Sequence, residues 1–131
     1  MSKLGLLKNV YALILISVAI SAFAQVSLKA GMASPSVQKA LAEGGERLSI
    51  LLAVALNPLV LLGLFLYFGS AAVWLLVLSK VQVSFAYPFV ALGFVLTALL
   101  GRFFFNDTFS AAKVIGTLLI VSGVVVLANG A

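Results

Sequence analysis

The sequence predicts an all-α membrane protein with four transmembrane helices. Of its 131 residues, 64% are hydrophobic and 8% are charged, a balance that a soluble domain of this length cannot bury. The apolar residues form long runs, separated by breaks that contain proline, glycine, asparagine or serine. A run of about 20 apolar residues is long enough to cross a bilayer as a helix. We therefore expect one domain, residues 1–131, built from four spanning helices.

The first predicted span covers residues 10–32. Gly31 can end this helix, and a Ser-Pro pair at positions 34 and 35 marks the break after it. Residues 33–49 are the only hydrophilic stretch. They predict either a flexible loop or one short helix lying in the membrane interface. The apolar side of such a helix would be formed by Val37, Leu41, Leu48 and Leu51.

The second predicted span begins inside a long apolar run. Residues 50–79 are too many for one plain span, and Asn57 followed by Pro58 divides them. Asparagine caps helix N-termini, and proline suits the first position of a helix. We therefore place the second helix at residues 58–79 and expect residues 51–56 to dip toward the membrane before it.

The last two spans cover residues 84–105 and 111–128. Pro88 lies in the first turns of the third span and Gly93 follows it, a combination that predicts a kink and a close helix contact. Ser110 can cap the fourth span. Small residues in that span, Gly116 and Gly123, predict a surface for self-association or for pairing with a homologous chain. The alternative is that they pack against helices of the same chain.

The composition argues against several classes of function. The chain has no cysteine and no histidine, so thiol chemistry and the commonest metal ligand are missing. We expect no enzyme activity, no metal and no cofactor, because acid–base chemistry is poorly supplied by the three acids, Glu43, Glu46 and Asp107. The net charge is +5, but the basic residues are too scattered for a nucleic-acid site, and most suit helix ends at the lipid headgroups.

Charge does not decide the orientation in the membrane. The predicted spans place Lys3, Lys8 and Lys80 on one side, and Lys39, Arg47, Arg102 and Lys113 on the other. This difference is too small to act as a positive-inside signal. The basic start of the chain is similar to that of a signal peptide, but the apolar run after it is too long, and we expect it to be retained.

A polar stripe follows one face of the first predicted helix. Its members are four residues apart, a spacing that keeps side chains on one face of a helix: Ser17, Ser21, Gln25 and Lys29. Polar and ionisable side chains at membrane depth usually face a bundle interior or a wet cavity. The stripe therefore predicts a binding site, with the other helices as its walls. The alternative for Lys29 is a lysine that reaches the headgroups from a helix end.

These landmarks resemble four-helix members of the drug/metabolite transporter superfamily, which include the small multidrug resistance and EamA-like proteins. The similarity is carried by residues 73–105, with the triplet Ala86-Tyr87-Pro88, and by residues 106–128, with an acid at the turn and two glycines. The resemblance implies a transporter half that joins a second half of inverted topology around a site at the membrane midplane. Exporters of the small multidrug resistance type carry a glutamate in the first helix. Ser21 falls at that position here. Because a serine cannot titrate near neutral pH, a proton-coupled drug exporter of that type is disfavoured.

A closer resemblance is to the small subunits proposed to flip aminoarabinose-phosphoundecaprenol across the bacterial inner membrane. Those subunits have a glutamine and a lysine four residues apart, as Gln25 and Lys29 are here. They also have the WLLVL run, a basic residue at the position of Arg102 and an acid at that of Asp107. The resemblance implies a multi-pass inner-membrane protein that moves a polyprenyl-phosphate-linked sugar and pairs with itself or with a homologous subunit.

Such a substrate has an anionic phosphate, a polar sugar and a long lipid tail. Under the resemblance, Lys29 binds the phosphate, with Arg102 as a second candidate. The sugar is bound by groups on two helices: Gln25, Ser21, Ser17 and Tyr87. Each role has a plainer alternative, since serines bond neighbouring helices, Arg102 can anchor at the interface, and Tyr87 with Pro88 can simply set a kink. Asp107 is expected to serve as a turn or cap residue, or as a partner for Lys113.

Two other functions remain open from the sequence. One is the export of small molecules or drugs, which loss of efflux in a stripe variant would support. The other is a membrane assembly subunit without transport activity, for which Lys29→Ala and Gln25→Ala would leave complex function intact.

Overall fold

The computed structural model describes residues 3–44 and 46–130, with side chains from residue 8 onward, and it confirms the predicted all-α membrane class. In this part of the chain, four helical segments are long and apolar enough to cross a membrane: Lys8–Met32, Pro58–Leu78, Val83–Phe105 and Ala111–Gly130. They belong to α1 (Lys3–Met32), α4 (Pro58–Leu78), α6 (Val90–Phe105) and α7 (Ala111–Gly130). α6 is preceded by α5 (Val83–Ala86) and by the 3-10 turn η1 (Tyr87–Phe89).

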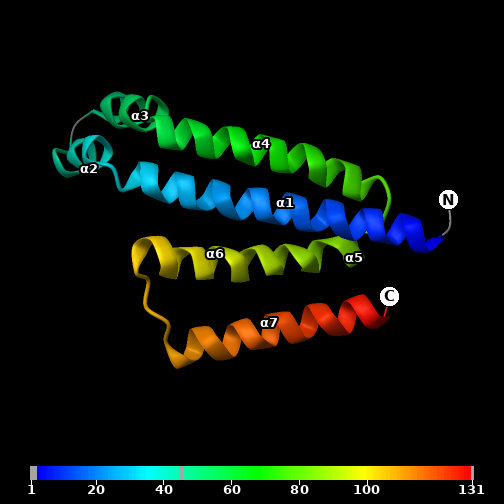
Figure 1. Cartoon of the computed structure of the whole chain (residues 1–131). Coiled ribbons are helices and arrows are strands. Elements are labelled where there is room, and N and C mark those ends of the chain that lie inside the picture. The colour runs from blue at the N-terminus through cyan, green and yellow to red at the C-terminus, as the bar shows by residue number, and fades with distance from the viewer. Residues whose placement is uncertain (1–2, 45, 131) are drawn as a thin grey trace.

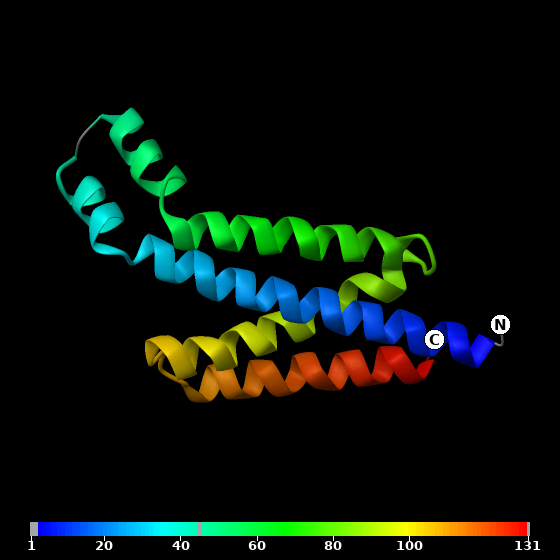
Figure 2. The same cartoon turned by 45° about the horizontal axis from the view of Figure 1, so that its top comes forward.

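The four long helices lie side by side (Figure 1). α1 and α4 run antiparallel and in close contact, α6 lies on the other side of α1, and α7 lies beyond α6 (Figure 1, Figure 2). The beginning of α1 and the end of α7 lie at the same end of the bundle. The opposite end carries Lys29, Arg102 and Lys113, near the last turns of α1 and α6 and the first turn of α7.

Glycine allows α1 and α4 to approach closely. A Cβ atom on Gly31 would lie 2.6 Å from Cγ2 and 2.8 Å from the backbone nitrogen of Val60. A Cβ atom on Gly63 would lie 2.7 Å from Cγ of Leu28. Small residues at such contacts let helix backbones pack together in a membrane, where apolar side chains gain nothing over lipid.

A second packed region lies toward the beginning of α1. Its buried residues come from α1, α4, α5, η1 and α7: Val10, Ile14, Val18, Val77, Ala86, Phe89 and Val124. The rings of Tyr11, Phe85 and Phe89 meet beside it, with Tyr11 and Phe89 centroids 5.8 Å apart. Because Val124 lies in the second half of α7, this half of the helix is fixed to the bundle. The first half of α7 contributes no residue to this core.

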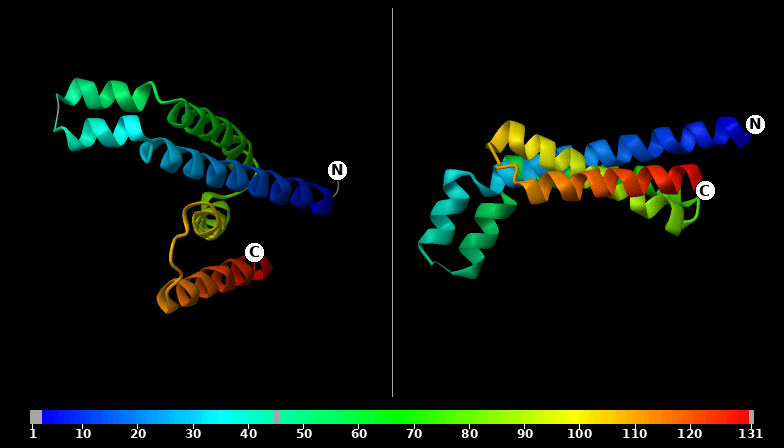
Figure 3. Two further views of the ribbon diagram at one scale, coloured as in Figure 1. Left: turned by 60° about the vertical axis from the view of Figure 1, so that its left-hand side comes forward. Right: turned by 90° about the horizontal axis from the view of Figure 1, so that it is seen from below.

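The hydrophilic stretch differs from the prediction of one interfacial helix or a loop. It contains two helices, α2 (Pro35–Ala42) and α3 (Arg47–Ala55), which project from the end of the bundle as a hairpin (Figure 3). The segment expected to dip toward the membrane at residues 51–56 is thus largely the last part of α3. The four predicted apolar residues do not form one face, because Val37 is buried on α2, Leu41 is exposed on the same helix, and the two other leucines are exposed on α3.

Local signals explain most helix ends. The Asn57 side chain accepts hydrogen bonds from the backbone of Leu59 and Val60, so the predicted cap of α4 is confirmed. The predicted cap by Ser110 is confirmed as well, since its hydroxyl accepts from the backbone of Lys113 at 3.2 Å. Asn106 ends α6 in the left-handed conformation, with φ of 54°, which asparagine tolerates better than most residues.

Candidate functional site

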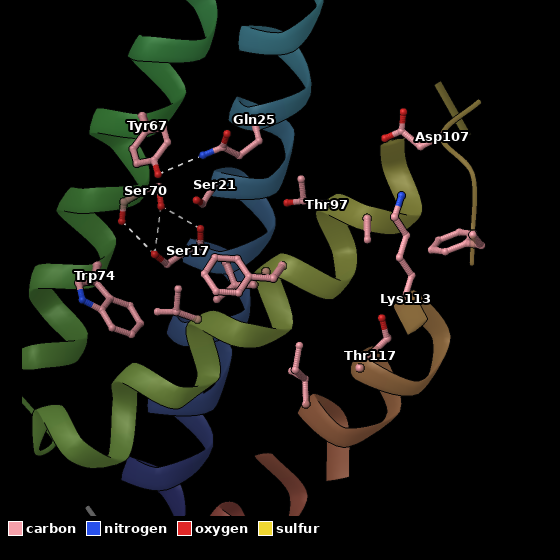
Figure 4. A pocket seen from close by; sticks show the side chains of 18 of the residues that line it. Ser17, Ser21, Gln25, Tyr67, Ser70, Trp74, Thr97, Asp107, Lys113 and Thr117 are labelled. Carbon is pink, nitrogen blue, oxygen red and sulfur yellow. Dashed lines mark hydrogen bonds between the residues drawn. The ribbon is translucent and has the colours of Figure 1, made fainter. Parts of the chain in front are cut away.

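A cavity of about 840 Å³ lies among the four long helices (Figure 4). Residues of α1, α4, α6 and α7 line it, together with the loop between α6 and α7. The first half of α7 lies away from the α1–α4 pair (Figure 1), and the core that holds its second half does not extend to it. The cavity therefore lies beside the half of α7 that is not part of this core.

The polar stripe of α1 supplies one wall of the cavity. Ser17, Ser21 and Gln25 all line it, whereas Lys29, one turn further along α1, does not. Ser17 is almost fully buried, and its hydroxyl donates to the backbone oxygen of Ser70 at 3.0 Å. The hydroxyl of Ser70 donates in return to the backbone oxygen of Ser17 at 2.9 Å. These reciprocal hydrogen bonds between Ser17 and Ser70 hold α1 and α4 together.

Gln25 is positioned by a residue of α4. Its side-chain nitrogen donates to the hydroxyl of Tyr67 at 3.1 Å (Figure 4). This bond uses one of the two amide hydrogens and leaves the amide oxygen as an acceptor. Ser21 lies between Ser17 and Gln25 on the same wall (Figure 4). The result is a short row of hydroxyl and amide groups that can bind a polar molecule.

The remaining walls are mostly apolar. α4 adds Trp74, which is the only tryptophan of the chain. α6 and α7 add mainly small or apolar side chains, among which Thr97 and Thr117 contribute hydroxyls (Figure 4). Gly116 also lines the cavity, and a Cβ atom there would meet nothing within 4 Å. The cavity thus combines one polar wall with apolar surfaces around it.

One end of the cavity carries two charges of opposite sign. We call this end the cavity mouth; it is lined by Asp107, Phe109 and Lys113, from the α6–α7 loop and the first turn of α7. Both charged residues are exposed. The ion pair suggested by the sequence is not formed within the described residues, where the only ion pair joins Lys39 and Glu43 at 4.0 Å. The Lys113 ammonium instead donates to the backbone oxygen of Thr108 at 2.7 Å.

Several predicted site residues lie outside the cavity. Lys29, Arg102 and Tyr87 are all exposed, and none of them lines it. Arg102 donates to the backbone oxygen of Asp107 at 3.4 Å. Any role of these three residues in binding stays a prediction.

The predicted hinge and association residues are placed as follows. Pro88 lies in the η1 turn at the start of the third span. Gly93 lines the cavity, and a Cβ atom there would lie 3.2 Å from Cγ1 of Val18 on α1. Gly116 lines the cavity, whereas Gly123 is exposed elsewhere on α7. Association through these two glycines stays a prediction.

Sequence reasoning missed the α4 wall and both charged residues of the mouth. Tyr67, Ser70 and Trp74 are spaced by three and four residues, so they share one face of α4. This spacing was a usable signal for a second polar face opposite the first. No comparable signal exists for Asp107 and Lys113, because their position depends on how the loop folds back over α6.

The chain matches curated proteins over part of its length. It is 48% identical over 58 residues to a protein of Pseudomonas aeruginosa (strain UCBPP-PA14), which is 44% of this chain and 50% of that protein. It is 39% identical over 71 residues to a protein of Pseudomonas fluorescens, or 54% and 62% of the two chains. A protein of Erwinia tasmaniensis is 39% identical over 57 residues, or 44% and 53%.

All three relatives are named probable 4-amino-4-deoxy-L-arabinose-phosphoundecaprenol flippase subunit ArnE. The matches therefore confirm the resemblance predicted from the motifs, although this chain covers only 50%, 62% and 53% of the length of these three relatives. No protein-family model matches the chain. No solved structure matches it either.

Proposed function

We propose that this chain is a membrane transport subunit that moves a polyprenyl-phosphate-linked sugar across the bacterial inner membrane. The observation that carries the proposal is the cavity among the four long helices, with its polar row on α1 and α4 and its apolar remainder. The names of the partial relatives support transport of a lipid-linked sugar.

The cavity suits a molecule with a polar head and an apolar tail. A sugar needs several hydrogen-bonding partners at once, because each of its hydroxyls loses water on entering the membrane. Ser21, Gln25 and Tyr67 provide such groups in one row, and Thr97 adds another hydroxyl from α6. A polyprenyl tail needs only apolar surroundings, and it can remain in the lipid beside the exposed first half of α7.

The phosphate requires a cation near the membrane surface. Lys29 lies one turn beyond Gln25 on α1 and is exposed. In this proposal Lys29 attracts the lipid phosphate before the head enters the cavity, with Arg102, in the last turn of α6 at the same end of the bundle, as a second cation. Tyr87 lies in the η1 turn near the opposite end and is 64% exposed. It would contact the substrate only after the head has crossed the membrane.

A second candidate function is export of cationic small molecules. It is favoured by one observation, namely that an acid, Asp107, lines the cavity mouth even though the first helix has no acid. A cationic dye that binds to the purified protein and is lost in Asp107→Asn would support it. Polyprenyl-phosphate lipids would then fail to compete with the dye.

A partner subunit is part of the proposal, because a single chain encloses its cavity incompletely. The second half of α7 has exposed apolar residues, including Val125 and Val126. We propose that this surface, with Gly123, contacts a second copy or a homologous four-helix subunit. The word subunit in the names of the relatives supports an assembly.

The experiment is native mass spectrometry of the purified protein, with identification of the lipids that it retains. Two glycines provide a matched pair of variants. A Cβ atom on Gly116 or on Gly69 would meet nothing within 4 Å, but only Gly116 lines the cavity. Leucine at position 116 adds bulk to the cavity wall, whereas leucine at position 69 adds the same bulk outside it.

The proposal predicts that the wild type and Gly69→Leu retain a polyprenyl phosphate or its glycosylated form, and that Gly116→Leu does not. If the wild type carries only bulk phospholipid, the proposal is contradicted. Equal retention by all three proteins would show that the lipid binds elsewhere on the surface.

A further inference from the structure

We infer that Asp107 and Lys113 at the cavity mouth are specificity residues for a substrate head that carries both an anionic and a cationic group. Lys113 binds the phosphate, and Asp107 binds a protonated amine on the sugar. This inference rests on the proposed function, because it assigns the charge pattern that the same cavity recognises.

The first argument is the isolation of the two charges. Among the residues that line the cavity, Asp107 and Lys113 are the only charged residues, and the other polar side-chain groups are hydroxyls, one amide and the indole N–H of Trp74. The two residues do not form an ion pair within the described part of the chain. Each charge is therefore available for a ligand of opposite sign at the mouth of a largely apolar cavity.

The second argument is how Asp107 is held. Its backbone N–H donates to the backbone oxygen of Gly101 at 3.3 Å, and its backbone oxygen accepts from Arg102. The left-handed conformation of Asn106 turns the chain back over α6. A Cβ atom on Gly101 would lie 2.5 Å from Oδ2 of Asp107. The carboxylate can occupy this position only because residue 101 has no side chain.

The turn itself does not need the carboxylate. The bonds that fix Asp107 in the loop are made by its backbone atoms. Asparagine at this position keeps the shape and the backbone bonds, and removes only the charge. The role of a turn residue therefore does not explain why an acid stands there.

Lys113 is also poorly explained by local structure. It is the third residue of α7, and a cation near a helix N-terminus is disfavoured by the helix dipole. Its ammonium donates one hydrogen bond, to Thr108, so two of its three donors remain for a phosphate oxygen. An anion bound by the ammonium at the mouth would offset this unfavourable interaction with the helix dipole.

Recognition of both charges gives a simple rule of specificity. A lipid phosphate with a neutral sugar would bind Lys113 but leave the Asp107 carboxylate without a partner. A lipid phosphate with an amino sugar would pair both charges. The acid is therefore predicted to select the amino sugar, and the lysine is predicted to strengthen binding of every lipid phosphate.

The test is a fluorescence titration of the purified full chain in detergent, with Trp74 as the reporter, because it is the only tryptophan and lines the cavity. Two probes differ by one group: undecaprenyl phosphate carrying 4-amino-4-deoxyarabinose, and the same lipid with a hydroxyl in place of the amine. A charge pair at exposed groups is worth enough to give the wild type a preference of up to about fivefold for the amino sugar. Control variants are Glu43→Gln and Lys39→Gln, which remove the same charges from an exposed pair on α2 and its C-terminus.

Asp107→Asn is expected to lose the preference while it binds the hydroxyl lipid as the wild type does. Lys113→Met is expected to weaken binding of both lipids by up to about fivefold, and Lys113→Arg is expected to restore it. The two control variants should behave as the wild type.

If Asp107→Asn keeps the preference, or if the wild type binds both lipids equally, the inference is overturned and the proposed function stands. If the wild type binds neither lipid, the proposed function fails together with the inference. Should Lys113→Met fail to fold, the Asp107→Asn titrations still decide the role of the acid.

Discussion

Replacing Gly31 by alanine should loosen the contact between α1 and α4 that supports the polar wall of the cavity. The added Cβ atom would lie 2.8 Å from the backbone nitrogen of Val60 and 2.9 Å from Oδ1 of Asn57. A backbone atom cannot change rotamer. The helices must therefore move apart, or the N-terminal turn of α4 must distort at its cap.

The size of the effect follows from these distances. Bringing the 2.8 Å contact to an ordinary 3.4 Å requires a shift of about 0.6 Å between two packed helices. Overpacking of this kind typically costs about 1–3 kcal/mol. Gly63→Ala should cost less, because the atoms within 3.0 Å of the added carbon belong to the side chain of Leu28, and the nearest backbone atom, the oxygen of Ala24, is 3.1 Å away. Gly69→Ala should cost nothing, since no atom lies within 4 Å of the added carbon.

The assay is thermal unfolding of the three variants in the same detergent, followed by loss of monodisperse protein after heating. The predicted order of stability is Gly69→Ala, then Gly63→Ala, then Gly31→Ala. An equal melting temperature for Gly31→Ala and Gly69→Ala would refute the close α1–α4 contact. It would also remove the basis for placing the α1 and α4 polar groups in one wall.

Three further changes test other parts of the structure. Ser70→Ala removes the donor to the Ser17 backbone and should lower stability by about 0.6 kcal/mol, and by at most about 1.7 kcal/mol, in the same unfolding assay. The control is Ser122→Ala, which removes only a bond within α7. Equal stability of the two variants would show that the Ser17–Ser70 bonds do not hold α1 and α4 together. Asn106→Ala should lower stability by about 1–2 kcal/mol because the left-handed conformation is unfavourable for alanine, while Asn106→Gly should be tolerated. Equal stability of the two variants would contradict a left-handed residue at the end of α6. Gly123→Leu should weaken association in cross-linking experiments, and an unchanged cross-linking pattern would mean that this part of α7 is not the interface.

The spans and their capping residues could be predicted from the sequence because they depend on local chemistry. Long apolar runs require a lipid environment, and the bonds of Asn57 and Ser110 involve neighbours a few residues away. The start of α1 was less predictable, since the helix begins at Lys3 rather than near Val10. Polar residues before a span can continue a helix without any change in periodicity.

The hairpin of α2 and α3 illustrates a limit of pattern reasoning. The apolar residues of α2 and α3 have the spacing expected of one longer amphipathic helix, so the sequence pattern alone favours a single helix or a loop. The break includes Gly44, which has a φ of 58°. A left-handed glycine ends one helix and allows the next to turn back.

The candidate site could be predicted only on the helix that carries the stripe. Spacing placed Ser17, Ser21 and Gln25 on one face, and they line the cavity together. Spacing could not tell that Lys29 lies beyond its end, nor that the α6–α7 loop would bring Asp107 into it. Both outcomes depend on tertiary packing, which no local pattern encodes.

The most direct test of the central claim is a flip assay in proteoliposomes. The protein is purified with any subunit that it carries and reconstituted with undecaprenyl-phosphate aminoarabinose. A membrane-impermeant amine reagent then labels the lipid on the outer leaflet. The account predicts that wild type and Gly69→Leu make the inner-leaflet pool accessible to the reagent, and that Gly116→Leu does not. Labelling confined to the outer leaflet in wild-type vesicles, as in protein-free vesicles, would contradict it.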